Sequence, residues 1–92
     1  MRREIAVSLP SMPADETEIA AVIDARGLSC PMPLVKARQA LMVLPGGAVI
    51  RVLATDPAAA RDFEELADVA GHTLLDIREA AGVLAILLRK RG

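Results

Sequence analysis

Aromatic residues are nearly absent from this chain of 92 residues, which has no Trp, no Tyr and one Phe. Proteins that bind single-stranded nucleic acid stack bases on aromatic side chains and follow the phosphates with excess positive charge. Here 11 Lys and Arg residues are balanced by 12 Asp and Glu residues, for a formal net charge of −1. The composition therefore argues against direct binding of nucleic acid.

Cysteine is equally scarce, because Cys30 is the only one in the chain. A single thiol forms no internal disulfide and supplies no multi-thiolate zinc site, so we expect neither a metal nor a cofactor. A reducing compartment is the simplest setting for a free thiol. We therefore expect a cytoplasmic protein.

Long apolar runs are missing as well. The run at residues 5–9 is broken by Ser8 and followed by Pro10 and Pro13, which makes it too short for a signal peptide or a membrane span. We expect no membrane association. Residues 1–18 are expected to be an N-terminal extension, either a tail or an extra edge strand, that is dispensable for folding.

The remainder has the composition of one small globular domain, with 53% hydrophobic and 25% charged residues. Residues 19–24 form a short apolar run typical of a strand, and residues 48–55 a nearly apolar run that suits a central strand. Residues 73–79 and 83–89 are expected to be two further strands, joined as a hairpin across a turn at 80–82.

Two segments between these strands have helical spacing. Residues 31–44 carry apolar side chains on one face and end before Pro45-Gly46-Gly47, with the apolar face formed by Leu34, Ala37, Leu41 and Leu44. The second helix is expected to begin with Asp56 as its N-cap and Pro57 at the first helical position, and to end at Gly71. Its buried side chains are expected to be Ala59, Phe63, Leu66 and Ala70.

The element order is therefore β-α-β-α-β-β. Strands separated by one helix are expected to run parallel, and the last two strands antiparallel. The pattern predicts an α+β two-layer sandwich, in which a four-stranded mixed sheet carries both helices on one face.

Cys30 lies between the first strand and the first helix. Chemistry in open α/β sheets gathers at the carboxyl ends of parallel strands, and Cys30 is expected at that edge, beside the helix N-terminus. The helix dipole lowers a thiol pKa only slightly, Pro31 and Pro33 remove two N–H donors, and the direction of Arg26 is unknown. We therefore expect a pKa modestly below that of an ordinary cysteine.

A weakly activated thiolate suits attack on an already reactive persulfide better than attack on an amide or an ester. The lack of a second cysteine fits the same chemistry. A nearby thiol would attack a persulfide on Cys30, release sulfide and leave a disulfide. In this chain a persulfide on Cys30 is therefore expected to persist until an acceptor outside the chain removes the sulfur.

The segment Asp24-Ala-Arg-Gly27-Leu-Ser-Cys30-Pro-Met-Pro33 resembles the C-P-x-P signature of the TusA/SirA-like sulfur-carrier family. The similarity continues through Lys36-Ala-Arg38, Pro45-Gly46, Thr55-Asp56-Pro57, Arg61-Asp62 and Gly71-His72. It spans roughly residues 20–91, so residues 19–92 are expected to form the sulfur-carrier domain.

The resemblance implies a cysteine that accepts sulfane sulfur from a cysteine desulfurase or a rhodanese and relays it to an acceptor protein. The family's outlets include tRNA thiolation, molybdenum-cofactor synthesis and sulfur oxidation. Transferred to this sequence, Cys30 is the persulfide carrier, and Gly27, Pro31 and Pro33 shape its loop. Such a sulfurtransferase-type carrier acts stoichiometrically in a sulfur relay. Some relatives have a second cysteine in the second helix, at the position where this chain has Ala67. Any function that depends on that second thiol is therefore in doubt for this chain.

Candidate residues for docking a partner surround this motif. They are Arg26, Met32, Lys36 and Arg38. For Lys36 and Arg38, the simpler interpretation is that they lie on the solvent-exposed face of the first helix. Three other features are expected to be structural. Asp56 caps the second helix, although it can also approach Cys30; His72 starts a strand facing solvent; and residues 89–91 form a frayed basic end.

Two alternative functions use the same cysteine. One is a haem-binding module, in which the Cys-Pro thiolate is the axial ligand and His72 is the only other strong ligand. The other is a thiol-dependent regulator in which Cys30 senses redox state. A redox sensor usually has a low thiol pKa and often a resolving cysteine, neither of which the sequence favours.

Overall fold

The computed structural model of the protein describes residues 18–92, so the predicted tail or edge strand in residues 1–17 lies outside the described residues. The predicted order of strands and helices is confirmed. The elements are β2 (Ala21–Ala25), α1 (Met32–Val43), β3 (Val49–Ala54), α2 (Ala59–Ala70), β4 (Thr73–Ala80) and β5 (Val83–Arg89).

The four strands form one mixed sheet in the order β2-β3-β5-β4. β2 and β3 run parallel, with Ile23 opposite Val52, while β5 is antiparallel to both β3 and β4. The predicted four-stranded mixed sheet is thus confirmed. β4 runs in the same direction as β3, as expected for strands joined through a helix, but β5 lies between them.

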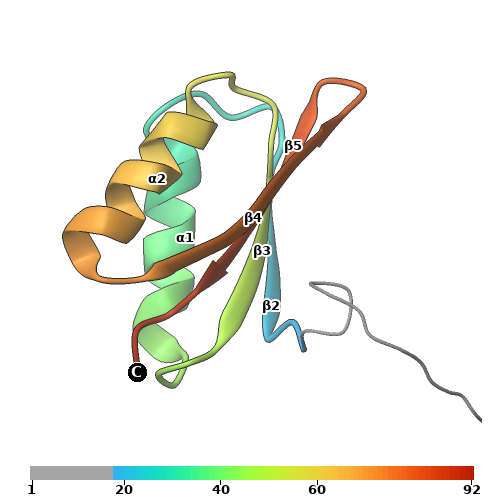
Figure 1. The fold of residues 1–92 in the computed structure, drawn as a ribbon. Coiled ribbons are helices and arrows are strands. Elements are labelled where there is room, and N and C mark those ends of the chain that lie inside the picture. Colours follow the sequence, from blue (N-terminus) through green and yellow to red (C-terminus); the bar gives the residue numbers. More distant parts are fainter. Residues whose placement is uncertain (1–17) are drawn as a thin grey trace, which may run out of the picture.

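Both helices pack on the same face of the sheet, which gives the two predicted layers (Figure 1). Strand alternation directs Ile50, Val52 and Ala54 of β3 into the space between the layers, where each is fully buried. The other buried residues of this core are Ile23, Ala25, Ala37, Leu41, Ala59, Phe63, Ala67, Ile86 and Leu88.

The buried face of α2 differs slightly from the prediction. Ala59 and Phe63 are buried as expected, but Ala67 completes the face. Leu66 and Ala70, which were predicted to be buried, are only half-buried. The helix also begins at Ala59, two residues after Pro57. It ends as predicted at Gly71, which adopts a left-handed conformation with φ of 78°.

The C-terminal residues are held against the domain, so the prediction of a frayed basic end is wrong. The Lys90 N–H donates to the Ala48 carbonyl at 2.8 Å, and the Lys90 ammonium donates to the carbonyls of Leu41 and Leu44 at 2.6 Å each. Carbonyls at the end of a helix have no partner within the helix, so a cation placed there is stabilising. Lys90 therefore caps the C-terminal turn of α1.

His72 is also part of this arrangement and does not face solvent as predicted. It is half-buried, and its Nδ1 accepts a hydrogen bond of 3.0 Å from the Arg91 N–H. Burial, followed by the charges of Arg91 and Lys90, lowers the pKa of His72. The neutral imidazole is therefore a fixed acceptor that helps to hold the C-terminal residues.

The helices of the described domain are short. None of those between residues 18 and 92 is long and apolar enough to cross a membrane.

Candidate functional site

Two loops meet at one edge of the sheet because β2 and β3 are parallel and end there together (Figure 1). The loop after β2 carries Cys30, and the loop after β3 carries Thr55 and Asp56. Two hydrogen bonds join them. The Gly27 N–H donates to Thr55 Oγ1 at 2.9 Å, and the Cys30 N–H donates to Asp56 Oδ2 at 2.7 Å. The backbone of the cysteine is thus fixed from the neighbouring loop.

The loop-shaping residues predicted from the sequence have distinct places. Gly27 has φ of 81°, a left-handed conformation that a residue with a side chain rarely adopts. Pro31 is exposed at the start of α1, and Pro33 is buried in its first turn. The Cys30–Pro31 peptide bond is cis. Gly27 is therefore needed for the turn that leads from β2 into the Cys30 loop.

The thiol of Cys30 is exposed and contacts a carboxylate that sequence reasoning missed. Cys30 Sγ lies 2.9 Å from Asp62 Oδ2, and the thiol donates this hydrogen bond. Asp62 belongs to the first turn of α2, where its N–H donates to the Ala58 carbonyl at 3.0 Å. The sequence signals were an acidic residue in the first turn of a helix that starts at the same sheet edge, and the place of Arg61-Asp62 in the resemblance to the sulfur-carrier family.

The prediction of a mildly lowered thiol pKa is wrong. The pKa of Cys30 is raised, first by the hydrogen bond to Asp62, then by desolvation, and then by the negative charges of Asp62 and Asp56. The helix N-terminus offers little to oppose this, because the Met32 N–H donates to the Ser29 carbonyl at 2.9 Å. The resting side chain is therefore a neutral, weakly nucleophilic thiol.

Asp56 approaches Cys30, as considered, but the prediction that it is the N-cap of α2 is wrong, because the N-cap is Ala58. Asp56 Oδ1 accepts a hydrogen bond of 3.0 Å from the Ala58 N–H at the start of α2, while its Oδ2 accepts the hydrogen bond from the Cys30 N–H. These two hydrogen bonds, that of Ala58 first, lower the pKa of the Asp56 carboxyl. Asp56 thus couples the start of α2 to the cysteine loop.

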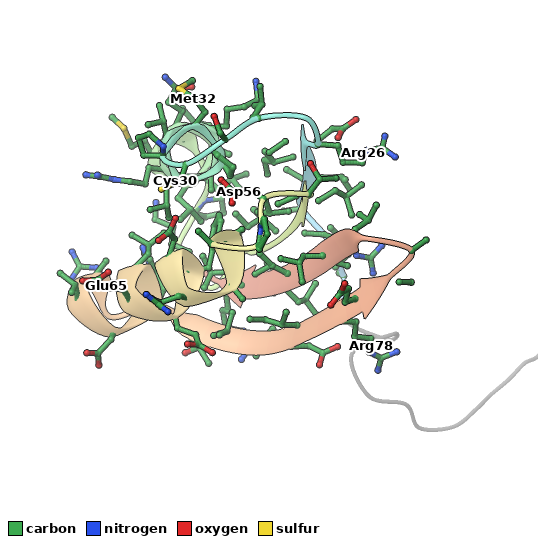
Figure 2. All side chains as sticks on the ribbon, turned by 90° about the horizontal axis from the view of Figure 1, so that it is seen from above. Arg26, Cys30, Met32, Asp56, Glu65 and Arg78 are labelled. Atoms are coloured by element: carbon green, nitrogen blue, oxygen red, sulfur yellow. The ribbon has the colours of Figure 1, made fainter. Side chains whose placement is uncertain are left out.

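Arg26 does not assist the thiol. Its guanidinium binds the carboxylate of Asp24 through two hydrogen bonds of 2.8 Å, and this pair holds the pKa of Asp24 at about 2. Viewed from above, Cys30, Asp56 and Met32 gather at one end of the helices, while Arg26 lies apart at the end of β2 (Figure 2). Within residues 18–92, no cation forms a hydrogen bond with Cys30.

The remaining docking candidates do not form one cluster. Met32 lies beside Cys30 with 45% of its surface exposed, and Val35 on the same helix is 37% exposed. Lys36 is exposed on the side of α1 that faces Asp24, whose pKa its charge helps to lower. Arg38 lines a groove of about 690 Å³ between the C-terminal ends of the helices, which also includes Met42, Asp68, Val69 and His72.

The geometry argues against the haem alternative. His72 follows the C-terminus of α2, while Cys30 contacts Asp62 in the first turn of this helix, ten positions earlier in the chain. At 1.5 Å per residue this is a distance of about 15 Å, too far for two axial ligands of one iron. Within residues 18–92, no group of three His, Cys, Asp or Glu side chains is placed to hold a metal ion.

The two exposed cations of α1 provide a first test of the surface assignment. Replacing Lys36 and Arg38 with Gln is expected to change the free energy of unfolding by less than about 1 kcal/mol, because both side chains are on the solvent side. Thermal melting measures this. We also expect slower sulfur loading from a protein donor but unchanged loading from a small persulfide. Unfolding of the double variant would show that these side chains support the fold.

Comparison with known proteins identifies the family. The model of the family described as "Sulfurtransferase TusA" matches residues 21–90. The chain belongs to the TusA family. Sulfur carrier protein TusA of Allochromatium vinosum is 37% identical over 68 residues, which are 74% of this chain and 90% of the relative. Sulfur carrier protein TusA of Pseudomonas putida is 39% identical over 71 residues, 77% of this chain and 89% of the relative.

The crystal structure of a SirA-like protein from Desulfitobacterium hafniense has the same fold. It superposes with a TM-score of 0.69 at 24% identity and covers 78% of this chain and 99% of its own. The predicted two-layer fold and the predicted family are both confirmed. The prediction of a sulfur carrier is confirmed with them, since the function of the TusA family is to carry sulfur. A carrier requires a donor from which it takes sulfur and an acceptor to which it delivers it.

Proposed function

We propose that Cys30 is the residue to which this TusA-family carrier binds sulfur, and that it holds the sulfur as a persulfide. The observation that carries the proposal is the exposure of the only thiol in the chain at the edge where two loops are joined. Sulfane sulfur is transferred by attack of a cysteine sulfur on the terminal sulfur of a persulfide. That attack requires an accessible thiol, and a second protein can approach Cys30 from solvent.

The fixed backbone of Cys30 suits a carrier that meets two partners in turn. The hydrogen bond from the Cys30 N–H to Asp56 supports one position of the loop in both encounters. Met32 and Val35 give a partner an apolar contact beside the sulfur, with Lys36 one turn further along α1. We place the docking face on this end of the molecule, with Arg26 at its margin and Arg38 outside it.

The donor in this proposal is a cysteine desulfurase or a rhodanese, and the acceptor is a protein of tRNA thiolation, molybdenum-cofactor synthesis or sulfur oxidation. The carrier works in the cytoplasm, stoichiometrically, without direct contact with nucleic acid or membrane. Residues 19–92 form the carrier domain and residues 1–18 an extension. The raised pKa of Cys30 is a reason to prefer this role to that of a redox sensor, which needs a readily formed thiolate.

The proposal is tested by loading the protein with sulfur. Incubation with a cysteine desulfurase and cysteine, or with a rhodanese and thiosulfate, is expected to add the mass of one sulfur atom to the intact protein. A reductant is expected to remove it. If several competent donors leave the mass unchanged, and Cys30 resists alkylation until the chain unfolds, Cys30 is a structural residue and the proposed site is wrong.

A further inference from the structure

The carboxylate of Asp62 lies against the atom that the proposed function loads with sulfur. Its Oδ2 is 2.9 Å from Cys30 Sγ. The ion pairs of residues 18–92 are Arg26–Asp24 and Arg78–Asp76, so Asp62 is not neutralised by a cation in this part of the chain. The hydrogen bond from the Cys30 thiol is therefore the interaction of the Asp62 carboxylate at this edge of the sheet. This contact is favourable because the Cys30 sulfur is protonated.

We propose that Asp62 distinguishes the empty carrier from the loaded one, by holding the Cys30 thiol through a hydrogen bond and releasing the side chain once sulfur is attached. This inference rests on the proposed function, because it assumes that Sγ receives the sulfur. It adds a residue that controls both the reactivity of the empty thiol and the direction in which the loaded sulfur is presented.

The loading step removes the hydrogen-bond donor. The Cys30 sulfur attacks the terminal sulfur of the donor's persulfide, the new Sγ–S bond forms, and the S–S bond of the donor breaks. The proton of the Cys30 thiol ends on the departing sulfur of the donor, which leaves as a thiol. The sulfane sulfur atom moves from one cysteine sulfur to another without a change in its oxidation state. No oxidant or reductant is therefore consumed.

After loading, Sγ is bonded to Cβ and to the carried sulfur and has no proton to donate. The carboxylate of Asp62, in contact from α2, then faces lone pairs instead of a donor, and the charge of Asp56 from the β3–α2 loop adds to the repulsion. The Cys30 N–H remains fixed to Asp56, so rotation of the side chain relieves the contact. The carried sulfur is thereby turned away from α2, toward solvent and an acceptor.

In the empty carrier, the contact between Asp62 and the Cys30 sulfur is attractive. The thiol is held by Asp62 in the protonated form, which is a poor nucleophile and a poor competitor for sulfur that has just been delivered. The raised pKa of Cys30 agrees with this state. The same contact therefore slows the reaction of an unloaded carrier with the loaded protein and with small electrophiles.

The test compares Asp62→Asn with wild type before and after loading with glutathione persulfide, the loaded state being verified by intact mass. For the empty proteins, the rate of alkylation by iodoacetamide is measured against pH. At neutral pH we expect about tenfold faster alkylation of D62N, because loss of the Asp62 carboxylate lowers the thiol pKa and increases the fraction of thiolate. For the loaded proteins, we expect alkylation of the carried sulfur at equal rates, because the contact with Asp62 is already lost.

Asp68→Asn is the matched control, since Asp68 is exposed on the same helix and the substitution makes the same change in net charge. It is expected to react like wild type in both states. Asp62→Ala, which leaves neither a donor nor an acceptor, serves as the second variant, and thermal melting verifies that each protein is folded.

Two results would overturn the inference. Equal alkylation of empty wild type, D62N and D62A would show that Asp62 does not restrain the thiol. A tenfold difference that persists in the loaded proteins would show that the contact is not released. If wild type gains no sulfur from the persulfide or from any protein donor, the proposed function fails, and the inference that depends on it fails too.

Discussion

Replacing Phe63 with alanine is expected to destabilise the protein by about 3–5 kcal/mol, the usual effect of removing a buried aromatic ring. Phe63 is the only aromatic residue of the chain and is fully buried between α2 and the sheet. Single domains are stable by only about 5–15 kcal/mol, so this loss is a large part of the total. In a domain of this size, it corresponds to a fall in melting temperature of roughly 12 °C or more.

Val69→Ala on the same helix is the matched control for Phe63→Ala. Val69 is 80% exposed, so its truncation is expected to change the free energy of unfolding by less than about 0.5 kcal/mol. Chemical denaturation of both variants gives the comparison. A similar effect of the two substitutions would mean that α2 does not pack on the sheet through Phe63, and the described core would be wrong.

Replacing Cys30 with serine is expected to abolish sulfur loading completely and to leave the fold intact. An alcohol forms no persulfide, and the sequence has no other thiol to take over. Cys30 is exposed, and a serine hydroxyl can still donate a hydrogen bond to Asp62, so the change in stability is expected to stay within about 0.5 kcal/mol. Intact mass after incubation with a desulfurase and cysteine measures loading, and thermal melting measures stability.

The stability measurement decides how the loading result is interpreted. A folded Cys30→Ser protein that gains no sulfur agrees with a carrier cysteine. A Cys30→Ser protein that unfolds would show that the thiol has a structural role. A folded variant that still gains one sulfur atom would show that the sulfur is bound elsewhere, and Cys30 would not be the carrier site.

The order of the strands shows how far the sequence determines this fold. Apolar runs, helical spacing and turn residues together predicted every strand and helix between residues 18 and 92. They did not predict that β5 lies between β3 and β4. A signal existed, since β5 is apolar on both faces and is buried at Ile86, Leu87 and Leu88. Charged residues of β4 such as Asp76 and Arg78 suit an edge strand.

The site was predicted less completely than the fold. Cys30 was chosen as the candidate site residue from its position in a loop at a strand end, a local feature that the sequence displays. Its contact with Asp62 joins residues separated by 32 positions, and no local pattern reports such a pairing. An acid in the first turn of a helix is also explained by the helix dipole alone, and the family resemblance of Arg61-Asp62 did not indicate a contact with the cysteine.

The error in the thiol pKa has the same origin. The prediction weighed the dipole of α1 and the N–H groups of the first helix, which are close in sequence to Cys30. The groups that determine the shift are Asp62 and Asp56, which belong to α2 and the loop before it. Because the parallel pairing of β2 and β3 brings both helix starts to one edge, the second helix contributes as much to the site as the first.

The most direct test of the account is to locate the carried sulfur on the chain. Wild-type protein is loaded by a cysteine desulfurase, separated from it, alkylated with iodoacetamide and digested. Trypsin cleaves after Arg26 and Lys36, so Cys30 is released within the peptide of residues 27–36. We expect tandem mass spectrometry to find that peptide with one additional sulfur atom between Cys30 and the alkyl group. A loaded protein whose peptide of residues 27–36 carries no additional sulfur would contradict the account.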